Sequence, residues 1–291
     1  MFVSETKTVS NDLSDSVCAA MIARLEDEYK YLEADGSNDI TGEQDFILLH
    51  QISKGFYKKC FTDIYENYVP LYHSLWKLRL KNVSNIANIH QDGGVHYFSK
   101  NGYDSRMLTI WTNIYRDEIE NLSPQDMGIF VVDNQHDKNT PIYGEMSREN
   151  SHFVEKRKGQ LSDCMHVCGP VLSCDTQSLH KTYLAYGPGA SILFNSHLLH
   201  GSSRCEKDMS QFSASDLEKF RVSLTSVWIH KEDLDSELMA LSEAEHENVY
   251  LSRVKPEDRE EVKQFFSEAC ALENYRINRI KRLIDEFHTN G

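Results

Sequence analysis

The feature that most constrains the fold is a block of short apolar segments set between two helical ends. In the middle of the chain these segments are rich in β-branched and aromatic residues and are separated by Gly, Pro, Asn and Asp, a composition typical of strands and turns. They do not alternate with helical patterns, so we expect an all-β core preceded and followed by helices. The segments are 83–90, 107–115, 128–132, 190–195 and 221–229.

Both ends of the chain have a helical periodicity. Within 14–66, apolar residues recur at spacings of three and four, as at Phe46, Leu49, Ile52 and Phe56, with a break at 34–39. The segment 233–291 continues in the same way from a first turn at Pro256, with Ile280, Leu283 and Ile284 on one stripe.

We therefore predict one domain over 1–291, in which 67–232 is the β core. The long polar stretch 133–162 inside this core has the length and composition of a functional lid or of a disordered loop.

Bulk composition limits the class of protein. The chain has 291 residues, 40% of them hydrophobic, enough for one large domain with a sizeable interior. The net charge of −14 repels phosphate backbones, so no nucleic-acid partner is expected. No run approaches the roughly 18 apolar residues of a membrane span, and the N-terminus lacks a signal-like pattern. These features favour a cytoplasmic enzyme acting on a small molecule, with the oligomeric state open.

Seven scattered cysteines do not indicate a disulfide framework, because their number is odd. Four residues do cluster, and a zinc site is an alternative for them. Their spacing, C-x-H-x-C-x5-C, departs from the paired knuckles typical of structural zinc. They are Cys164, His166, Cys168 and Cys174.

The first chemically informative motif is His90-Gln91-Asp92-Gly93-Gly94. On an extended strand, residues two apart point to the same side, so His90 and Asp92 share a face. An imidazole and a carboxylate presented together are two of the three ligands in a facial triad that binds Fe(II). By itself the motif also fits a histidine at a strand end beside a turn aspartate.

The second motif begins with a Gly-Pro-Gly turn at 187–189, which leads into the apolar segment 190–195 and on to His200 and Gly201. A histidine that closes such a strand is well placed to complete the triad from across a barrel. His197 competes with His200. We prefer His200, because the neighbouring Gly201 leaves room beside a metal.

The third motif is the segment 221–229, which opens with Arg221. On a strand, Arg221 and Ser223 share a face. A guanidinium in the interior needs a carboxylate partner, and its planar fork matches one in a bidentate manner. Together with the Ser223 hydroxyl it forms a candidate receptor for a carboxylate ligand. An internal salt bridge is the alternative, and Arg204, in a polar loop, is a second candidate arginine.

In this order the motifs resemble those of the Fe(II)/2-oxoglutarate-dependent oxygenase superfamily, in particular its phytanoyl-CoA dioxygenase-like branch. The resemblance rests on 89–94, 108–115, 187–203 and 221–224 and extends over roughly residues 70–230. One departure concerns the arginine, which in that branch lies closer to the distal histidine. Here Arg221 follows His200 by 21 residues, and an insert at 205–219 implies a longer loop.

The resemblance implies a double-stranded β-helix, a cupin-like jelly roll, with iron inside its open end. It implies Fe(II), O2 and 2-oxoglutarate as cofactors and co-substrates, and hydroxylation of a small polar molecule with decarboxylation of 2-oxoglutarate to succinate and CO2. The implied iron ligands are His90, Asp92 and His200, and Arg221 with Ser223 would hold the co-substrate.

If the odd-numbered residues of 107–115 face the interior, two of them, Asn113 and Thr109, are candidate co-substrate contacts. Trp111 and Asn88 are then candidate substrate contacts. Two other functions remain open: a cupin-type metal enzyme that does not use 2-oxoglutarate, and a non-catalytic jelly-roll binding protein.

Overall fold

The computed structural model describes part of the chain, and every structural statement below concerns that part. The described residues are 5–8, 15–17, 19–20, 36–39, 43–81, 106–120, 122–123, 126–132, 180–184, 189–196, 198, 200–202, 207–234, 256, 260 and 278–284.

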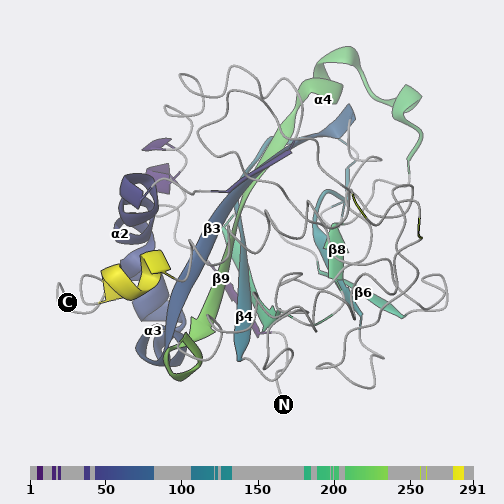
Figure 1. Cartoon of the computed structure of the whole chain (residues 1–291). Coiled ribbons are helices and arrows are strands. Elements are labelled where there is room, and N and C mark those ends of the chain that lie inside the picture. Colours follow the sequence, from purple (N-terminus) through teal and green to yellow (C-terminus); the bar gives the residue numbers. More distant parts are fainter. Residues whose placement is uncertain are drawn as a thin grey trace.

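A six-stranded antiparallel sheet forms the centre of the molecule (Figure 1). Its long middle strands, β4 (Met107–Arg116), β9 (Phe220–His230) and β3 (Tyr68–Arg79), pair in the order β4-β9-β3. The order across the whole sheet is β1-β7-β4-β9-β3-β2, and the remaining strands are β1 (Glu5–Thr8), β7 (Ala190–Asn195) and β2 (Gly36–Asp39).

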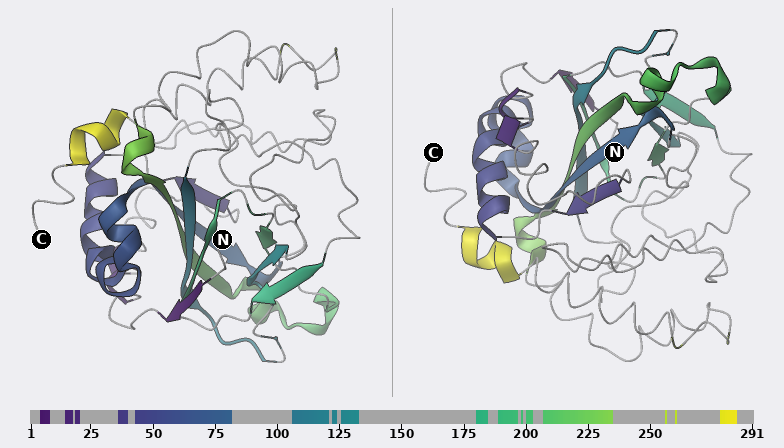
Figure 2. Two further views of the ribbon diagram at one scale, coloured as in Figure 1. Left: turned by 90° about the horizontal axis from the view of Figure 1, so that it is seen from below. Right: turned by 90° about the horizontal axis from the view of Figure 1, so that it is seen from above.

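A second, smaller sheet faces the first. It consists of β6 (Lys181–Leu184), β5 (Ile129–Val132) and β8 (His200–Ser202), again all antiparallel, in the order β6-β5-β8. Figure 2 shows this sheet on one side of the large sheet and the helices on the other. A two-sheet antiparallel core with flanking helices is the cupin-like architecture that the sequence predicts.

The helices cover the outer face of the large sheet. They are α2 (Glu43–Cys60), α3 (Thr62–Asn67) and the helical residues 278–284. Phe46 and Leu49 of α2 are fully buried against Leu75 and Leu224 of the sheet, and Ile280 joins the same cluster. No helix in the described ranges has the length and apolar character needed to cross a membrane.

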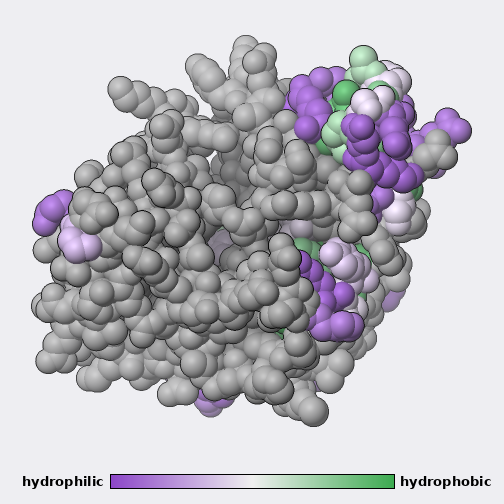
Figure 3. Space-filling model, turned by 90° about the vertical axis from the view of Figure 1, so that its right-hand side faces the viewer, coloured by the Kyte–Doolittle hydropathy of each residue, from purple (hydrophilic) through white to green (hydrophobic). Residues whose placement is uncertain are grey.

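The short helices of the fold lie at the two ends of β9. Before it come the 3-10 helix η4 (Met209–Gln211) and α4 (Ala214–Glu218), and after it comes the 3-10 helix η5 (Lys231–Asp233). Met209, Phe212 and Leu217 pack on the core. The described residues at the upper right of Figure 3 are largely hydrophilic, with hydrophobic residues among them. The longer loop expected between His200 and Arg221 therefore contains η4 and α4.

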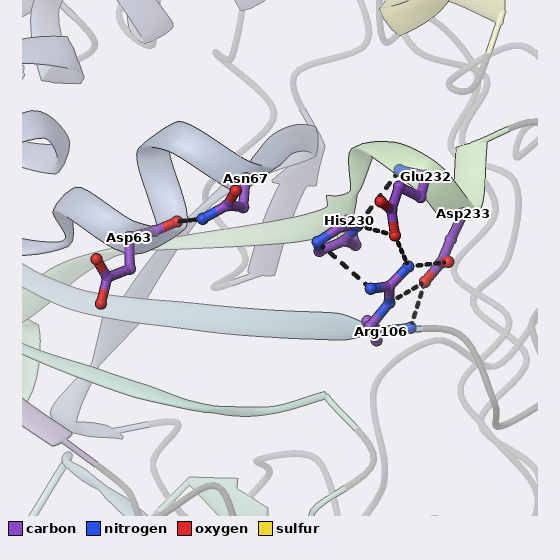
Figure 4. A network of polar contacts seen from close by, with 6 residues as sticks. All are labelled: Asp63, Asn67, Arg106, His230, Glu232 and Asp233. Carbon is purple, nitrogen blue, oxygen red and sulfur yellow. Dashed lines mark hydrogen bonds and ion pairs between the residues drawn. The ribbon is translucent and has the colours of Figure 1, made fainter.

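Arg106 joins the start of β4 to the end of β9 (Figure 4). Its guanidinium donates to both oxygens of Asp233, at 2.7 and 3.1 Å, and to Glu232 at 2.8 Å. The His230 backbone N–H also donates to the Arg106 carbonyl at 3.0 Å. This exposed network fixes which residues of the two strands lie opposite each other, at the end of the sheet remote from Arg221.

The strands predicted at 107–115, 128–132, 190–195 and 221–229 are confirmed, each to within one residue at either end. The helical prediction is confirmed in α2, and the break expected at 34–39 contains the short strand β2. The predicted strand at 83–90 and the lid-like stretch 133–162 lie outside the described residues.

β3, the longest strand among the described residues, was not predicted from the sequence, and it pairs with β9 along its length. The signal was present, since Val69, Leu71 and Leu75 are buried and alternate with other residues. Pro70 argued against a central strand because proline cannot donate to a ladder. The structure accommodates it at an irregularity of the pairing between Pro70 and Tyr72.

Candidate functional site

The site lies on the face of β4 that points away from the helices. Leu108 and Ile110 belong to the cluster under α2 and α3, whereas Trp111 packs with Ile129 and Val131 of the small sheet. Thr109, Trp111 and Asn113, which alternate with these two residues, therefore face the space between the two sheets. This is the facing that the sequence analysis assumed for Thr109, Trp111 and Asn113, and it is confirmed.

His200, the first residue of β8, is 5% exposed. Its Nδ1 lies 2.7 Å from the Leu198 carbonyl oxygen. A carbonyl only accepts, so Nδ1 carries the proton and Nε2 keeps its lone pair, the form in which histidine binds metals. The Phe194 ring, with its centre 4.7 Å from that of the imidazole, holds His200 from the side.

Gly201 has a different role from the one expected. A Cβ at this position would lie 2.8 Å from Cζ of Phe130, so the ring of Phe130 fills the space that the glycine leaves. The glycine is required for packing on the outer face of the small sheet. The expectation that it leaves room beside a metal was wrong, because neighbouring residues of a strand point to opposite faces.

Arg221, near the start of β9, is 2% exposed. One guanidinium nitrogen, Nη1, donates to Ser223 Oγ at 2.8 Å, so the predicted pairing of these two side chains on one face is confirmed. The guanidinium carbon lies 5.2 Å from the centre of the Trp111 ring, within the range of a cation–π contact.

The charge of Arg221 has no acidic partner in the described part of the chain, and its Nε has no hydrogen-bond acceptor there. Burial, with the nearby charge of Arg116 as a second cause, lowers the pKa of Arg221 to about 9. A buried charge without a counter-charge is costly for a fold. This side chain therefore has the properties of a receptor for an anion.

Strand register brings the other candidate contacts to this surface. Asn113, buried, lies opposite Ser223 on β9, and Trp111 lies opposite Thr225. Thr109 lies further along β4, and its hydroxyl is hydrogen-bonded to Ser196 Oγ at 2.9 Å. Asn113 is thus beside the Arg221–Ser223 pair. Thr109 lies two residues before Trp111 on β4, and its hydrogen-bond partner Ser196 is the residue after β7.

His200 and Arg221 are connected by apolar side chains. Phe194, which contacts His200, and Trp111, which contacts Arg221, belong to one buried cluster between the sheets. The cluster also contains Ile192 and Leu198. His200 and Arg221 therefore lie at the same apolar cluster between the two sheets, and this cluster excludes water.

Several predicted site residues lie outside the described residues: His90, Asp92, Asn88, and the competitors His197 and Arg204. The cysteine–histidine cluster at 164–174 also lies outside them. Within the described ranges no three metal-ligating side chains gather, and His200 is the one predicted iron ligand found there.

Arg116 is a residue of this region that the sequence analysis missed. It is the last residue of β4 and lies opposite Arg221. By simple alternation it belongs to the helix-facing set of β4. An irregularity in the pairing between Asn113 and Tyr115 shifts the register and places Arg116 against Arg221, and a single bulge of this kind is not visible in a sequence.

No protein-family model and no curated protein matches the sequence. Solved structures do match at low identity. AviO1 from Streptomyces viridochromogenes Tue57 has 11% identity and a TM-score of 0.43, over 76% of this chain and 84% of AviO1.

EctD from S. alaskensis, crystallised with 2-oxoglutarate and 5-hydroxyectoine, has 12% identity and a TM-score of 0.49, over 79% of this chain and 72% of EctD. The epimerase SnoN, in complex with Fe3+, alpha ketoglutarate and nogalamycin RO, has 8% identity and a TM-score of 0.44, over 77% of this chain and 78% of SnoN.

Two of these structures thus contain 2-oxoglutarate, named alpha ketoglutarate in the SnoN structure, and the SnoN structure also contains iron. The comparison does not single out the phytanoyl-CoA dioxygenase-like branch.

Proposed function

We propose that this chain is an Fe(II)- and 2-oxoglutarate-dependent oxygenase that hydroxylates a small polar molecule. In this proposal His90, Asp92 and His200 bind the iron, and Arg221 with Ser223 binds the co-substrate. The observation that carries the proposal is a fully buried guanidinium that faces the core between the sheets and has no acidic partner among the described residues.

A carboxylate is the natural ligand for this guanidinium. Nη1 of Arg221 is engaged with Ser223 Oγ, which leaves Nε, buried and without an acceptor, for a further hydrogen bond. Arginine offers a planar fork that a carboxylate matches with two parallel hydrogen bonds. Trp111 lies against the guanidinium and restricts its orientation. The distal carboxylate of 2-oxoglutarate would thereby neutralise the buried charge of Arg221.

The hydrogen bonding of His200 is that expected of a metal ligand. The Leu198 carbonyl accepts from Nδ1 at 2.7 Å and so fixes both the tautomer and the rotation of the ring. Such a partner behind the ligand raises its basicity and holds its direction. Iron prefers this mixture of imidazole and carboxylate ligands, so His200 fits the expected donor set, to which His90 and Asp92 would contribute the rest.

Bound iron would supply the oxidation, with O2 as oxidant and 2-oxoglutarate converted to succinate and CO2. The residues of the chain would position the reactants and exclude water. Arg221 and Ser223 would fix the end of the co-substrate, and Asn113, beside Ser223 on the next strand, is placed to contact its length. The wall formed by Trp111, Ile192, Phe194 and Leu198 would shield the reacting centre from water.

An anaerobic titration tests the proposal. Fe(II) and 2-oxoglutarate are added to the purified protein, and the weak visible charge-transfer absorption of their chelate is recorded. We expect saturation in the unmodified protein, no band in His200→Ala at the same iron concentration, and a much higher 2-oxoglutarate requirement in Arg221→Lys.

The other two candidate functions give different results in the same titration. A cupin-type metal enzyme that does not use 2-oxoglutarate would bind iron without the co-substrate band. A non-catalytic binding protein would give the band at most, with no succinate in air. Succinate release during incubation with pooled metabolites would then identify the substrate class.

A further inference from the structure

Arg116 is a second arginine at the edge of the candidate co-substrate site. It closes β4 directly opposite Arg221 on β9. It is half-buried, whereas Arg221 is fully buried. The two guanidinium-bearing residues are therefore an inner and an outer member of one cross-strand pair.

Like charges directly opposite each other on paired strands are destabilising. The effect is visible here, because the charge of Arg116 is one of the two causes that lower the pKa of Arg221. An anion close to both guanidinium groups would relieve this repulsion.

Among the described residues, an acid acts on Arg116 but none acts on Arg221. Arg116 donates from Nη2 to the Ser123 carbonyl at 3.0 Å, and Asp126 is the acid that attracts it. The Asp126 carboxylate also accepts from the Ser123 backbone N–H at 2.9 Å, so it is shared with the turn that it caps. Within the described part of the chain, no acid acts on Arg221.

We propose that Arg116 is a second anion-binding residue of the co-substrate site, which attracts the distal carboxylate of a dicarboxylate and so selects dicarboxylic over monocarboxylic 2-oxo acids. This inference rests on the proposed function and names a determinant of its co-substrate preference. Arg221 makes the direct contact, and Arg116 acts through the field that it adds.

The positive field of Arg116 opposes the negative net charge of the protein. The chain has a net charge of −14, so a doubly negative co-substrate is repelled as it approaches. A local pair of cations reverses the sign of the potential at one point and raises both the rate of association and the affinity. Arg116 is the more exposed of the pair and acts first on an approaching ligand.

The test is calorimetric binding under anaerobic conditions to the Fe(II)-loaded protein at low ionic strength. The ligands are 2-oxoglutarate and 2-oxobutanoate, which lacks the distal carboxylate. Arg116→Gln should weaken 2-oxoglutarate binding about tenfold, as expected for the loss of one nearby charge, and leave 2-oxobutanoate binding within about twofold. The difference for 2-oxoglutarate should shrink in high salt.

Two variants separate charge from structure. Arg116→Lys keeps the charge but changes the contact with Ser123, and it should retain most of the 2-oxoglutarate affinity. Arg79→Gln removes one charge from a neighbouring strand, where Arg79 pairs with Glu218 at 3.5 Å, and it should leave the affinity unchanged.

Each remaining result counts against a specific claim. If Arg116→Gln binds 2-oxoglutarate as the unmodified protein does, or if Arg116→Lys loses as much affinity as Arg116→Gln, the inference about Arg116 is wrong and the proposed function stands. If the unmodified Fe(II)-loaded protein binds no 2-oxoglutarate, the proposed function is wrong, and the inference fails with it.

Discussion

The Arg221 guanidinium lies against the Trp111 ring, with its central carbon 5.2 Å from the ring centre, at a point where β9 and β4 run side by side. The contact holds a buried cation in place without neutralising it. A tryptophan face attracts a cation through its quadrupole and yet leaves the donors in the guanidinium plane for another ligand. Arg221 is thus oriented to bind an anion, and its buried charge lowers the stability of the ligand-free protein.

The first prediction concerns that cost. Arg221→Met removes the buried charge and keeps an unbranched apolar chain against Trp111. Because a buried charge without a counter-charge destabilises, we expect the free energy of unfolding of the ligand-free protein to rise by about 1–3 kcal/mol. Denaturant titration measures it. The same variant should bind no 2-oxoglutarate, so that the co-substrate stabilises the unmodified protein only. A clear loss of stability in Arg221→Met would show that Arg221 has a structural counter-charge in the native fold.

The second prediction separates co-substrate binding from iron binding. Arg221→Lys keeps a positive charge but loses the planar fork, so the dissociation constant for 2-oxoglutarate should rise about 10- to 100-fold. Arg221 contacts Ser223 and Trp111 and no iron ligand in the described residues, so the Fe(II) affinity should stay within about twofold. Parallel titrations of iron and of 2-oxoglutarate give both values. Equal losses in the two titrations would place Arg221 in a role other than co-substrate recognition.

The third prediction decides between the two histidines of the distal motif. His200→Ala should lose most of the Fe(II) affinity and essentially all succinate formation, because its Nε2 is the expected third ligand. His200→Gln is the matched variant that keeps a polar side chain, and it should fail in the same way. His197→Ala should retain substantial activity. Full activity in His200→Ala together with loss in His197→Ala would show that the wrong histidine was chosen.

The parts of the site that the sequence predicts depend on regular alternation along a strand. Ser223 lies two residues after Arg221 on an uninterrupted part of β9, so both side chains share a face, and the structure confirms it. Trp111 and Asn113 follow from the same rule on β4. Alternation fails for Arg116, because the irregularity after Asn113 shifts the register. For Gly201, alternation gives the correct face, opposite to that of His200, but it does not reveal that Phe130, far away in the sequence, fills the space beside it. Patterns within a segment reveal facing, but not which residues of a distant segment lie opposite.

The fourth prediction concerns the packing of β8 on β5. A methyl group at position 201 would lie 2.8 Å from Cζ of Phe130, which is closer than carbon atoms approach without displacement. Gly201→Ala should therefore lower the free energy of unfolding by about 1–3 kcal/mol, the usual cost of overpacking. Phe130→Leu shortens the opposing side chain, so the double variant should recover part of the loss in denaturant titration. Because His200 is the adjacent residue, Gly201→Ala should also weaken Fe(II) binding. An unchanged stability would mean that the Phe130 ring moves aside freely.

The fifth prediction arises from His73, a fully buried histidine on the helix-covered face of β3. Its Nδ1 lies 2.8 Å from Ser226 Oγ, and the Tyr57 hydroxyl lies 2.8 Å from the same oxygen. Burial, followed by the charges of His50 and Arg279, holds the pKa of His73 well below its usual value. The groups packed around it come from three elements: Phe46, His50 and Tyr57 of α2, Ser226 of β9, and Arg279 of the C-terminal helical residues.

A depressed histidine pKa makes the fold sensitive to acid. Above about pH 6.5, the ordinary pKa of histidine, His73 is neutral in both the folded and the unfolded chain, and its contribution to stability does not change with pH. Below that pH the unfolded chain takes up a proton that the folded chain refuses. The free energy of unfolding should therefore fall by up to about 1.4 kcal/mol per pH unit as the pH decreases from about 6.5 toward 5.

Denaturant titrations across pH 5–8 measure this slope. His73→Asn keeps a group able to hydrogen-bond Ser226 and cannot be protonated, so its stability should be lower at pH 8 but should change less between pH 6.5 and 5. His180→Gln, at an exposed histidine before β6, is the matched control and should keep the slope of the unmodified protein. Because the slope reports proton uptake and not packing, a general loss of stability in His73→Asn does not obscure it. An identical slope in His73→Asn and the unmodified protein would show that another group takes up the proton.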